Sequence, residues 1–255
     1  MIPLRLWRSI AVLAVFLLGV PLHSFAAPAV AGSAQVLQFA AGTQDPAGQS
    51  VTVDASATAC YFLWQFYQAA AGHGLASVAL AGNAPGQSYE VASATGDQEA
   101  SGVAVWYNPP TGTQTLDPAW DAAPTDPTVT FFCTSGGDTS SWRDVQAANE
   151  SGSTATSVTV TTVSGDFVVK YDTHFSATTP TLTSGWTSIA TEGGGTTGQT
   201  NRTSSISASS TSQVCASQEP AYSTIVCFSI PAASAPSIVV NPLSGRGGAA
   251  AQPVN

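Results

Sequence analysis

Short segments of alternating apolar and polar residues recur from about residue 34 to residue 231, and this recurrence constrains the fold more than any other feature. Eleven such segments are separated by turn residues, and each has the length and the β-branched or aromatic content of a strand. Helical periodicity is nearly absent, since only residues 141–150 could form a helical turn, and they fit a loop equally well. The pattern predicts an all-β chain that folds as a single antiparallel β-sandwich of the jelly-roll type. The predicted strands are 50–54, 58–67, 75–82, 101–107, 113–117, 127–134, 155–163, 165–172, 184–190, 202–210 and 222–230.

The strand segments differ in how they should be covered. Residues 58–67, TACYFLWQFY, are apolar on both faces, so this strand should be buried on both sides. Residues 165–172 alternate, which predicts one face toward the core and one toward water. The predicted wet face holds Asp166, Val168, Lys170 and Asp172, and the core face holds Phe167, Val169 and Tyr171. The Ser-Gly link to residues 155–163 favours a hairpin between the two segments.

The first 27 residues have the three parts of a secretory signal peptide. Arg5 and Arg8 supply the basic region, residues 9–22 the apolar region, and small residues around Ala26 a cleavage site. The apolar run is about 14 residues, shorter than the ~20 that a membrane-spanning helix needs, and an uncleaved anchor is the alternative. The expected organisation is a signal peptide (1–27), an N-terminal lead-in (28–49), the β-sandwich domain (50–231) and a flexible Pro/Ala/Gly-rich tail (232–255).

The chain is acidic and carries few charges. It has 15 Asp and Glu against 6 Lys and Arg, and loss of Arg5 and Arg8 with the leader would make the mature chain more acidic still. This balance lacks the basic surface that nucleic acid binding needs, and it opposes binding to anionic membranes. We therefore expect no nucleic acid partner and no stable membrane insertion after cleavage. The expected location is extracellular or at the cell surface, with the periplasm as an alternative.

The four cysteines, Cys60, Cys133, Cys215 and Cys227, agree with export. An even number of cysteines in a secreted chain is typical of disulfides, and no C-x-x-C spacing indicates a zinc site. Three pairings are possible. The favoured one closes a short loop between Cys215 and Cys227 and leaves Cys60 to pair with Cys133.

Known catalytic patterns are absent from the sequence. There is no G-x-S-x-G elbow and no H-E-x-x-H, and His73 and His174 are best explained as structural or exposed residues. A glycosidase needs two carboxylates about 5–10 Å apart. Asp97 and Glu99 are close enough in sequence but fall in a polar loop, where solvated acids are the better interpretation. We therefore predict no catalytic residues, with a polysaccharide hydrolase built on paired carboxylates as the alternative.

Three acids could hold a structural calcium ion. Asp117, Asp121 and Asp126 are expected in one Pro-rich loop, and loop carboxylates of secreted β-sandwiches can bind Ca²⁺. No EF-hand spacing supports the site, and solvated turn acids are the simpler interpretation. No other metal site or cofactor is predicted.

Aromatic residues near turns are the best candidates for ligand binding, because their rings can stack on sugars while amide side chains hydrogen-bond the hydroxyls. The candidates are Trp106, Tyr107, Asn108, Trp120, Trp142 and Trp186. Core packing is the competing role, and it is favoured for Trp64 and Trp106. Trp120 and Trp142 are expected in loops, where either role is open.

The order of several motifs resembles a known family. An aromatic pair leads into the corner NPPTGT and a Thr-rich strand at residues 106–116, where Pro109 and Pro110 must end the strand because proline cannot donate to a β-ladder. The segments TVTFFCT, ATSVTVTTVSGDFVV and YSTIVCFSI follow. This arrangement resembles an uncharacterised extracellular β-sandwich domain of secreted bacterial and phage proteins, over residues 50–231. The resemblance implies the fold, and the family has no assigned reaction to carry over.

Together these observations predict an exported, non-catalytic β-sandwich. It would act as a binding or adhesion module, or as a structural part of a surface, with an extracellular glycan or a surface protein as its partner. Assembly through exposed strand edges is a further alternative.

Overall fold

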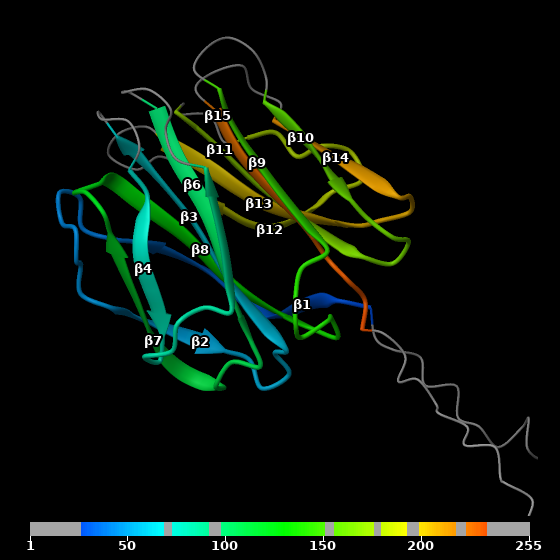
Figure 1. Cartoon of the computed structure of the whole chain (residues 1–255), viewed down its shortest axis with the longest axis horizontal. Helices are drawn as coiled ribbons and strands as arrows, with labels where there is room; N and C mark the ends of the chain where they lie inside the picture. Colours follow the sequence, from blue (N-terminus) through cyan, green and yellow to red (C-terminus); the bar gives the residue numbers. More distant parts are fainter. Residues whose placement is uncertain are drawn as a thin grey trace, which may run out of the picture.

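The computed structural model describes residues 27–68, 73–91, 98–150, 156–175, 180–192, 199–217 and 223–233. These residues form fifteen strands and no helix, and every strand pairing is antiparallel, so the predicted all-β fold is confirmed (Figure 1). The predicted signal peptide and most of the predicted tail lie outside the described residues. The strands are β1 (Ala29–Gln38), β2 (Gln49–Val53), β3 (Ala59–Gln68), β4 (Leu75–Leu80), β5 (Gln87–Val91), β6 (Gln98–Tyr107), β7 (Gly112–Trp120), β8 (Thr125–Ser135), β9 (Asp144–Glu150), β10 (Ser157–Thr161), β11 (Phe167–Phe175), β12 (Thr187–Glu192), β13 (Gln199–Ser207), β14 (Ser212–Ala216) and β15 (Ser223–Ile230).

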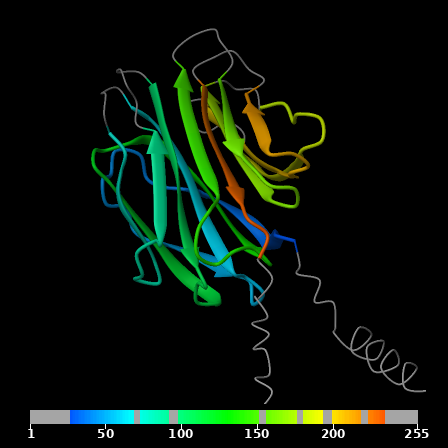
Figure 2. The ribbon, with the colours of Figure 1, turned by 45° about the vertical axis from the view of Figure 1, so that its right-hand side comes forward.

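Four sheets stack in layers around three apolar clusters. The first five-stranded sheet has the order β1-β8-β3-β6-β5, and the second has the order β12-β13-β11-β15-β9. A three-stranded sheet, β2-β7-β4, covers the outer face of the first sheet, and a two-stranded ribbon, β10-β14, covers the outer face of the second (Figure 1 and Figure 2). The facing sides of the two five-stranded sheets enclose the middle cluster. The protein is thus a β-sandwich with an additional layer on each side, and a jelly-roll topology is not confirmed.

Strand β3 shows how the first sheet is buried on both faces. Tyr61 and Leu63 belong to the middle cluster. The alternate residues Phe62 and Trp64 point toward the three-stranded sheet, where the Trp64 ring lies 5.8 Å from the ring of Trp120. All four β3 side chains are at most 1% exposed. This alternation confirms the predicted burial of the strand on both sides.

The alternating strand β11 is also covered on both faces, so the prediction of one wet face is wrong. Asp166, Lys170 and Asp172 are each at most 2% exposed, because the ribbon packs over this face of the second sheet. Alternation shows that the two faces of a strand differ in polarity, but a polar face can still be covered when its groups find partners. The predicted hairpin is wrong as well, since β10 pairs with β14, and β11 pairs with β13 and β15.

The sequence pattern does not predict four of the strands, β1, β5, β9 and β14. Residues 144–150 form β9 instead of a helical turn or loop, because their backbone pairs with the buried strand β15. Strand β1 lies in the segment 28–49, expected as a lead-in, and pairs with β8 in the first sheet. β1, β5 and β9 are all at sheet edges. An edge strand takes its hydrogen bonds from one strong neighbour, so its own sequence needs little β propensity.

Both predicted disulfides are present. Cys60 and Cys133 occupy paired positions on β3 and β8, with 4.0 Å between their Cα atoms. Cys215 and Cys227 tie β14 of the ribbon to β15 of the second sheet, with a Cα–Cα distance of 6.3 Å. Two disulfides fit an oxidising environment of the extracellular type. The described residues include no helix that could span a membrane.

Candidate functional site

A groove of about 370 Å³ lies at the corner between β6 and β7. Its lining comes from two parts of the chain, the end of β6 with the Pro-Pro corner and the turn between β4 and β5. The lining residues are Asn83, Ala84, Gly86, Trp106, Tyr107, Asn108, Pro109 and Pro110. We call this site the corner groove. It brings together three of the predicted binding residues, Trp106, Tyr107 and Asn108.

The corner itself is held by backbone geometry. β6 ends at Tyr107, and Asn108 takes a φ of 50°, a left-handed conformation that asparagine adopts more readily than most residues. The Asn108 N–H donates to the Thr58 carbonyl at 2.8 Å. Pro109 and Pro110 follow, and their rings fix φ. One wall of the groove is therefore already ordered before any ligand binds.

The opposite wall is the turn between β4 and β5. Asn83 and Leu80 exchange backbone hydrogen bonds of 2.9 and 3.0 Å, which close the turn. The Asn83 carbonyl also accepts the indole N–H of Trp106 at 2.9 Å and so ties the two walls together. A Cβ atom at Gly86 would lie 3.1 Å from the ring of Tyr107. Glycine at this position therefore allows the turn to approach the tyrosine closely.

The two aromatic residues of the groove have different roles. Trp106 is only 4% exposed and packs between the first sheet and the three-stranded sheet, so it is part of the core and not an open stacking surface. Tyr107 is half-buried, and its hydroxyl donates to Gln87 Oε1 at 2.7 Å. Burial raises the pKa of Tyr107 and keeps this hydroxyl protonated. Tyr107 and the exposed Asn108 are the predicted residues that a ligand can reach.

The other predicted aromatic residues lie elsewhere. Trp120 ends β7, is 2% exposed and stacks on Phe62 with 6.4 Å between ring centroids, so its expected place in a loop is wrong. Trp142 is half-buried and lies 6.2 Å from the ring of Phe228 on β15. Trp186 packs in the cluster beneath the ribbon. None of these three tryptophans lines the corner groove.

The corner groove carries no charge. Tyr107 is its one ionisable lining residue, and the other polar side chains that line it are carboxamides. An uncharged groove favours a neutral ligand, and no lining carboxylate is present to act as the acid or nucleophile of glycoside hydrolysis. Of the two acids considered for that reaction, Asp97 lies outside the described residues. Glu99 is on β6, and its side chain is not described.

The three acids considered for calcium do not share a loop. Asp117 is on β7 and Asp126 is on β8, with Asp121 between the two strands, so the expectation of one loop is wrong. Asp121 Oδ1 accepts the Gly74 N–H at 2.9 Å and lies 3.3 Å from His73 Nδ1. Within the described ranges, no three His, Cys, Asp or Glu side chains lie close enough together to hold a metal ion.

A second set of polar groups is enclosed beneath the ribbon, on the face of β11 expected to be wet. Lys170, the only lysine in the sequence, is 1% exposed. Its Nζ donates to the Ala216 carbonyl at 2.9 Å and to Thr183 Oγ1 at 3.3 Å. The same atom lies 3.7 Å from Asp172 Oδ2 and 5.2 Å from the ring centroid of Trp186. Burial lowers the pKa of Lys170, and the neighbouring carboxylate opposes that shift.

His174 lies further along the same face and is fully buried. Burial lowers its pKa to about 4, so the imidazole is neutral near pH 7. The structural role predicted for this histidine agrees with its burial, and an exposed position is excluded. The sequence signal for the cluster is the spacing of Lys170, Asp172 and His174 at every second residue. Because these groups are buried, we assign them to the fold and not to the candidate site.

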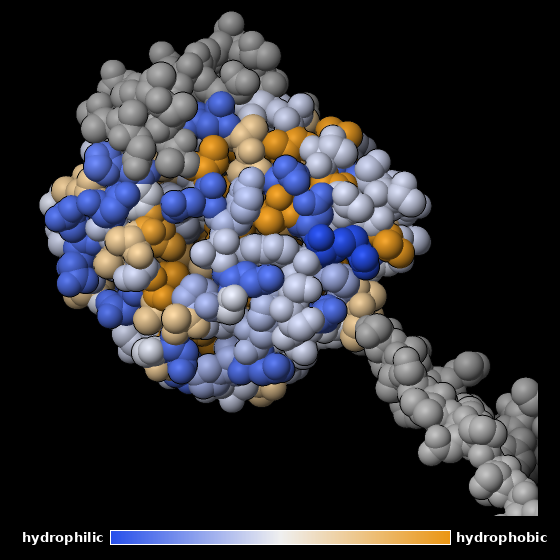
Figure 3. Space-filling model, viewed as in Figure 1, coloured by the Kyte–Doolittle hydropathy of each residue, from blue (hydrophilic) through white to orange (hydrophobic). Residues whose placement is uncertain are grey.

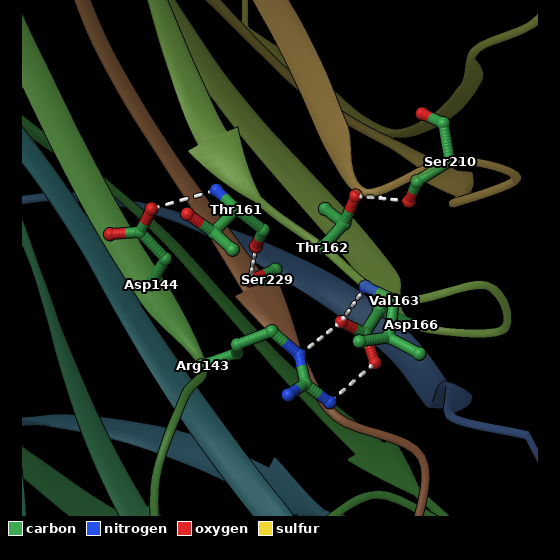
Figure 4. Close-up of polar contacts among 8 residues, drawn as sticks. All are labelled: Arg143, Asp144, Thr161, Thr162, Val163, Asp166, Ser210 and Ser229. Atoms are coloured by element: carbon green, nitrogen blue, oxygen red, sulfur yellow. Dashed lines mark hydrogen bonds and ion pairs between the residues drawn. The ribbon is translucent and has the colours of Figure 1, made fainter.

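Further polar contacts hold the ribbon and the link into β11 against the second sheet (Figure 4). Arg143 forms a two-pronged ion pair with Asp166, with 2.6 Å from Nε to Oδ2 and 3.2 Å from Nη2 to Oδ1. This contact holds the pKa of Arg143 above its usual value. Asp166 Oδ2 also accepts the Val163 N–H, and Asp144 Oδ2 accepts the Thr161 N–H at 2.7 Å. Both carboxylates therefore have structural partners.

No protein family matches the chain, and no curated protein or solved structure matches it either. The resemblance to secreted bacterial and phage β-sandwich domains therefore remains a prediction. The functional assignment rests on the geometry of the corner groove.

Proposed function

We propose that the protein is exported and acts as a non-catalytic binding or adhesion module that holds a neutral carbohydrate in the corner groove. The observation that carries this proposal is the lining of the groove, which combines an aromatic ring, proline rings and carboxamide side chains with no charged group. Ligand sites of this kind are largely preformed, with apolar walls and a few polar groups that fix orientation.

The lining suits the two kinds of surface that a sugar presents. The faces of a sugar ring are apolar, and the rings of Tyr107 and Pro110 offer apolar contact area. The rim of a sugar carries hydroxyl groups, and the carboxamide of exposed Asn108 can both donate to and accept from them. Since the corner is ordered without a ligand, little conformational entropy is lost on binding.

Export is supported by two independent features. The leader pattern of residues 1–27 is that of a signal peptide, and two disulfides fit an oxidising compartment. The proposed location is extracellular or at the cell surface, with the periplasm as the alternative. A polysaccharide hydrolase remains the alternative function, and release of reducing ends from a polysaccharide by the purified mature chain would favour it.

The experiment that tests the proposal is a glycan and cell-wall polymer binding screen on the mature chain, followed by titration of two groove variants. Asn108→Gly removes the carboxamide but accepts the positive φ, and Pro110→Ala removes an exposed ring. Each should weaken binding about tenfold, the effect of losing roughly 1.4 kcal/mol of contact. Val214→Thr, on the exposed face of the ribbon, is the control and should bind as the wild type does. Failure to bind any neutral glycan, or equal affinity in all four proteins, would contradict the proposal.

A further inference from the structure

A second groove, of about 380 Å³, lies where β1 crosses β2. It is lined by Gly32, Ser33, Gln35, Thr52 and Asp54, and we call it the bulge groove. The pairing of β1 with β8 shifts between Ala31 and Gln35, and Gly32 takes a φ of 70° within this bulge. A Cβ atom at Gly32 would lie 3.2 Å from Cβ of Asp54, so the bulge rests directly against that residue.

Most of the residues that line the bulge groove have polar side chains, and one of them is a carboxylate. The Gln35 side chain accepts the Thr52 N–H and donates to the Thr52 carbonyl, both at 2.9 Å, which fixes β1 across β2. Asp54 Oδ1 accepts the Ser56 hydroxyl at 2.6 Å and the Ser56 N–H at 2.8 Å, and these contacts lower the pKa of Asp54. The group is therefore an anion near pH 7. Carboxylates accept strong hydrogen bonds from hydroxyl groups, so this groove also suits a hydroxyl-rich ligand.

The two grooves lie on either side of one corner of the protein. Val53 of β2 pairs with Gly112 of β7. From this pair, the first strand continues forward to Asp54, and the second leads back along the sequence to Pro110. The turn that follows Asp54 reaches Thr58, whose carbonyl accepts the N–H of Asn108 at 2.8 Å. Asp54 lines the bulge groove, and Pro110 and Asn108 line the corner groove. Ala31 of β1 pairs with Cys133, which in turn pairs with Cys60, and Cys60 pairs with Trp106. Three strand spacings, about 14 Å, therefore separate β1 in the bulge groove from Trp106 in the corner groove.

We propose that the two grooves are subsites of one binding track, and that the ligand is an oligosaccharide chain long enough to cross the corner formed by residues 54–58 and 108–111. This inference rests on the proposed carbohydrate function. The corner groove takes a neutral sugar through Tyr107 and Asn108, and the bulge groove takes a neighbouring sugar whose hydroxyls donate to Asp54. Two linked subsites raise the affinity for a long ligand, because the second sugar is held close to its subsite once the first sugar has bound.

The test is calorimetric titration of the mature chain with the cellulose, chitin and mannan oligosaccharide series, from one to six sugar units. In the series that binds, affinity should rise about tenfold or more once the chain spans both grooves, and then level off. Asp54→Asn keeps the size of the side chain but removes its charge. It should abolish that rise with chain length, whereas Asn108→Gly should weaken binding at every length.

Asp117→Asn is the matched control, since Asp117 is an exposed acid on β7 that lines neither groove. A single sugar that binds as tightly as the longest chain, or an Asp54→Asn variant that keeps the length dependence, would overturn the two-groove track while leaving the proposed function intact. No binding by any member of the three series would overturn both.

Discussion

Lys170 provides a test of how the ribbon is held, because it is the only lysine in the sequence and lies beneath the ribbon. Burial lowers the pKa of its amine, so a larger fraction of the amine is neutral than in an exposed lysine. Since only the neutral amine is acylated, protonation protects Lys170 less than it protects an exposed lysine. Its protection comes from enclosure. We therefore predict that an amine-reactive ester modifies Lys170 only when the ribbon β10-β14 separates from the second sheet.

The size of the effect follows from the disulfide that ties the ribbon down. Cys215 and Cys227 are 12 residues apart in sequence, and closing a loop of this size stabilises a protein by about 3 kcal/mol in the chain-entropy account. If that stabilisation opposes lifting of the ribbon, removal of the disulfide should raise the rate of Lys170 acylation about a hundredfold. Cys60 and Cys133, 73 residues apart, close a larger loop worth about 4 kcal/mol, but they join β3 to β8, away from the ribbon.

The assay compares three proteins, the wild type, the double variant Cys215→Ala/Cys227→Ala and the double variant Cys60→Ala/Cys133→Ala. Acylation of Lys170 is followed by peptide mapping under native conditions. The first variant should react about a hundredfold faster than the wild type. The second should lose more global stability in denaturant titrations yet react at nearly the wild-type rate, because the opening that exposes Lys170 is local. Wild-type Lys170 reacting as fast as an exposed lysine, or equal acceleration in both variants, would refute the reasoning.

Three further predictions concern stability. Burial lowers the pKa of His174 from 6.5 to about 4, so between these pH values the unfolded chain binds a proton that the folded chain does not. The free energy of unfolding should therefore fall by up to about 3 kcal/mol as the pH drops through this window. His174→Gln should flatten that fall in urea titrations at several pH values, and an unchanged slope would contradict the assignment. Asn108→Ala should cost about 1 kcal/mol because alanine resists the positive φ, while Asn108→Gly should be close to neutral by the same titration. Arg143→Met should lower the stability measured by thermal unfolding by about 2 kcal/mol, since it leaves the 2%-exposed Asp166 carboxylate without its ion pair. Adding Asp166→Asn should recover part of this loss, and additive costs of the two substitutions would show that the pair does not interact.

The sequence predicts where most strands lie but not how they pair. Residues 157–161 and 167–175 both have clear β character, and a short link joins them, so a hairpin between them is the natural expectation. The structure instead pairs β10 with β14, more than fifty residues later. A period-two pattern is satisfied by either partner, because it records only which side chains share a face. The choice between partners depends on which layers the rest of the chain brings together, and that information is not local.

The candidate site, too, could be predicted only in part from the sequence. Trp106, Tyr107 and Asn108 could be singled out because an aromatic pair before two prolines is a local signal. The opposite wall, formed by Asn83 and Gly86, comes from the turn between β4 and β5, and nothing in its sequence points to the corner. The Pro-rich stretch around Trp120 favours a loop, yet β7 continues through Pro118 to the tryptophan. β7 is the middle strand of its sheet, but β2 pairs only with its residues 112–116, so at Pro118 the one partner is β4. Proline is tolerated at such a locally unpaired side of a strand, and that depends on how far the neighbouring strand extends.

The layered architecture limits where a ligand can bind. The three-stranded sheet covers one face of the first sheet, the ribbon covers one face of the second, and the two five-stranded sheets cover each other. Many Thr and Ser side chains are buried between the layers. The free-energy cost of burying a hydroxyl group is lower than that of burying a charged group, so these residues are tolerated there. Neither large sheet therefore offers a free face on which aromatic side chains could form a flat binding platform. The corner groove lies at the turns that end β4 and β6, and the bulge groove lies at the bulge of the edge strand β1.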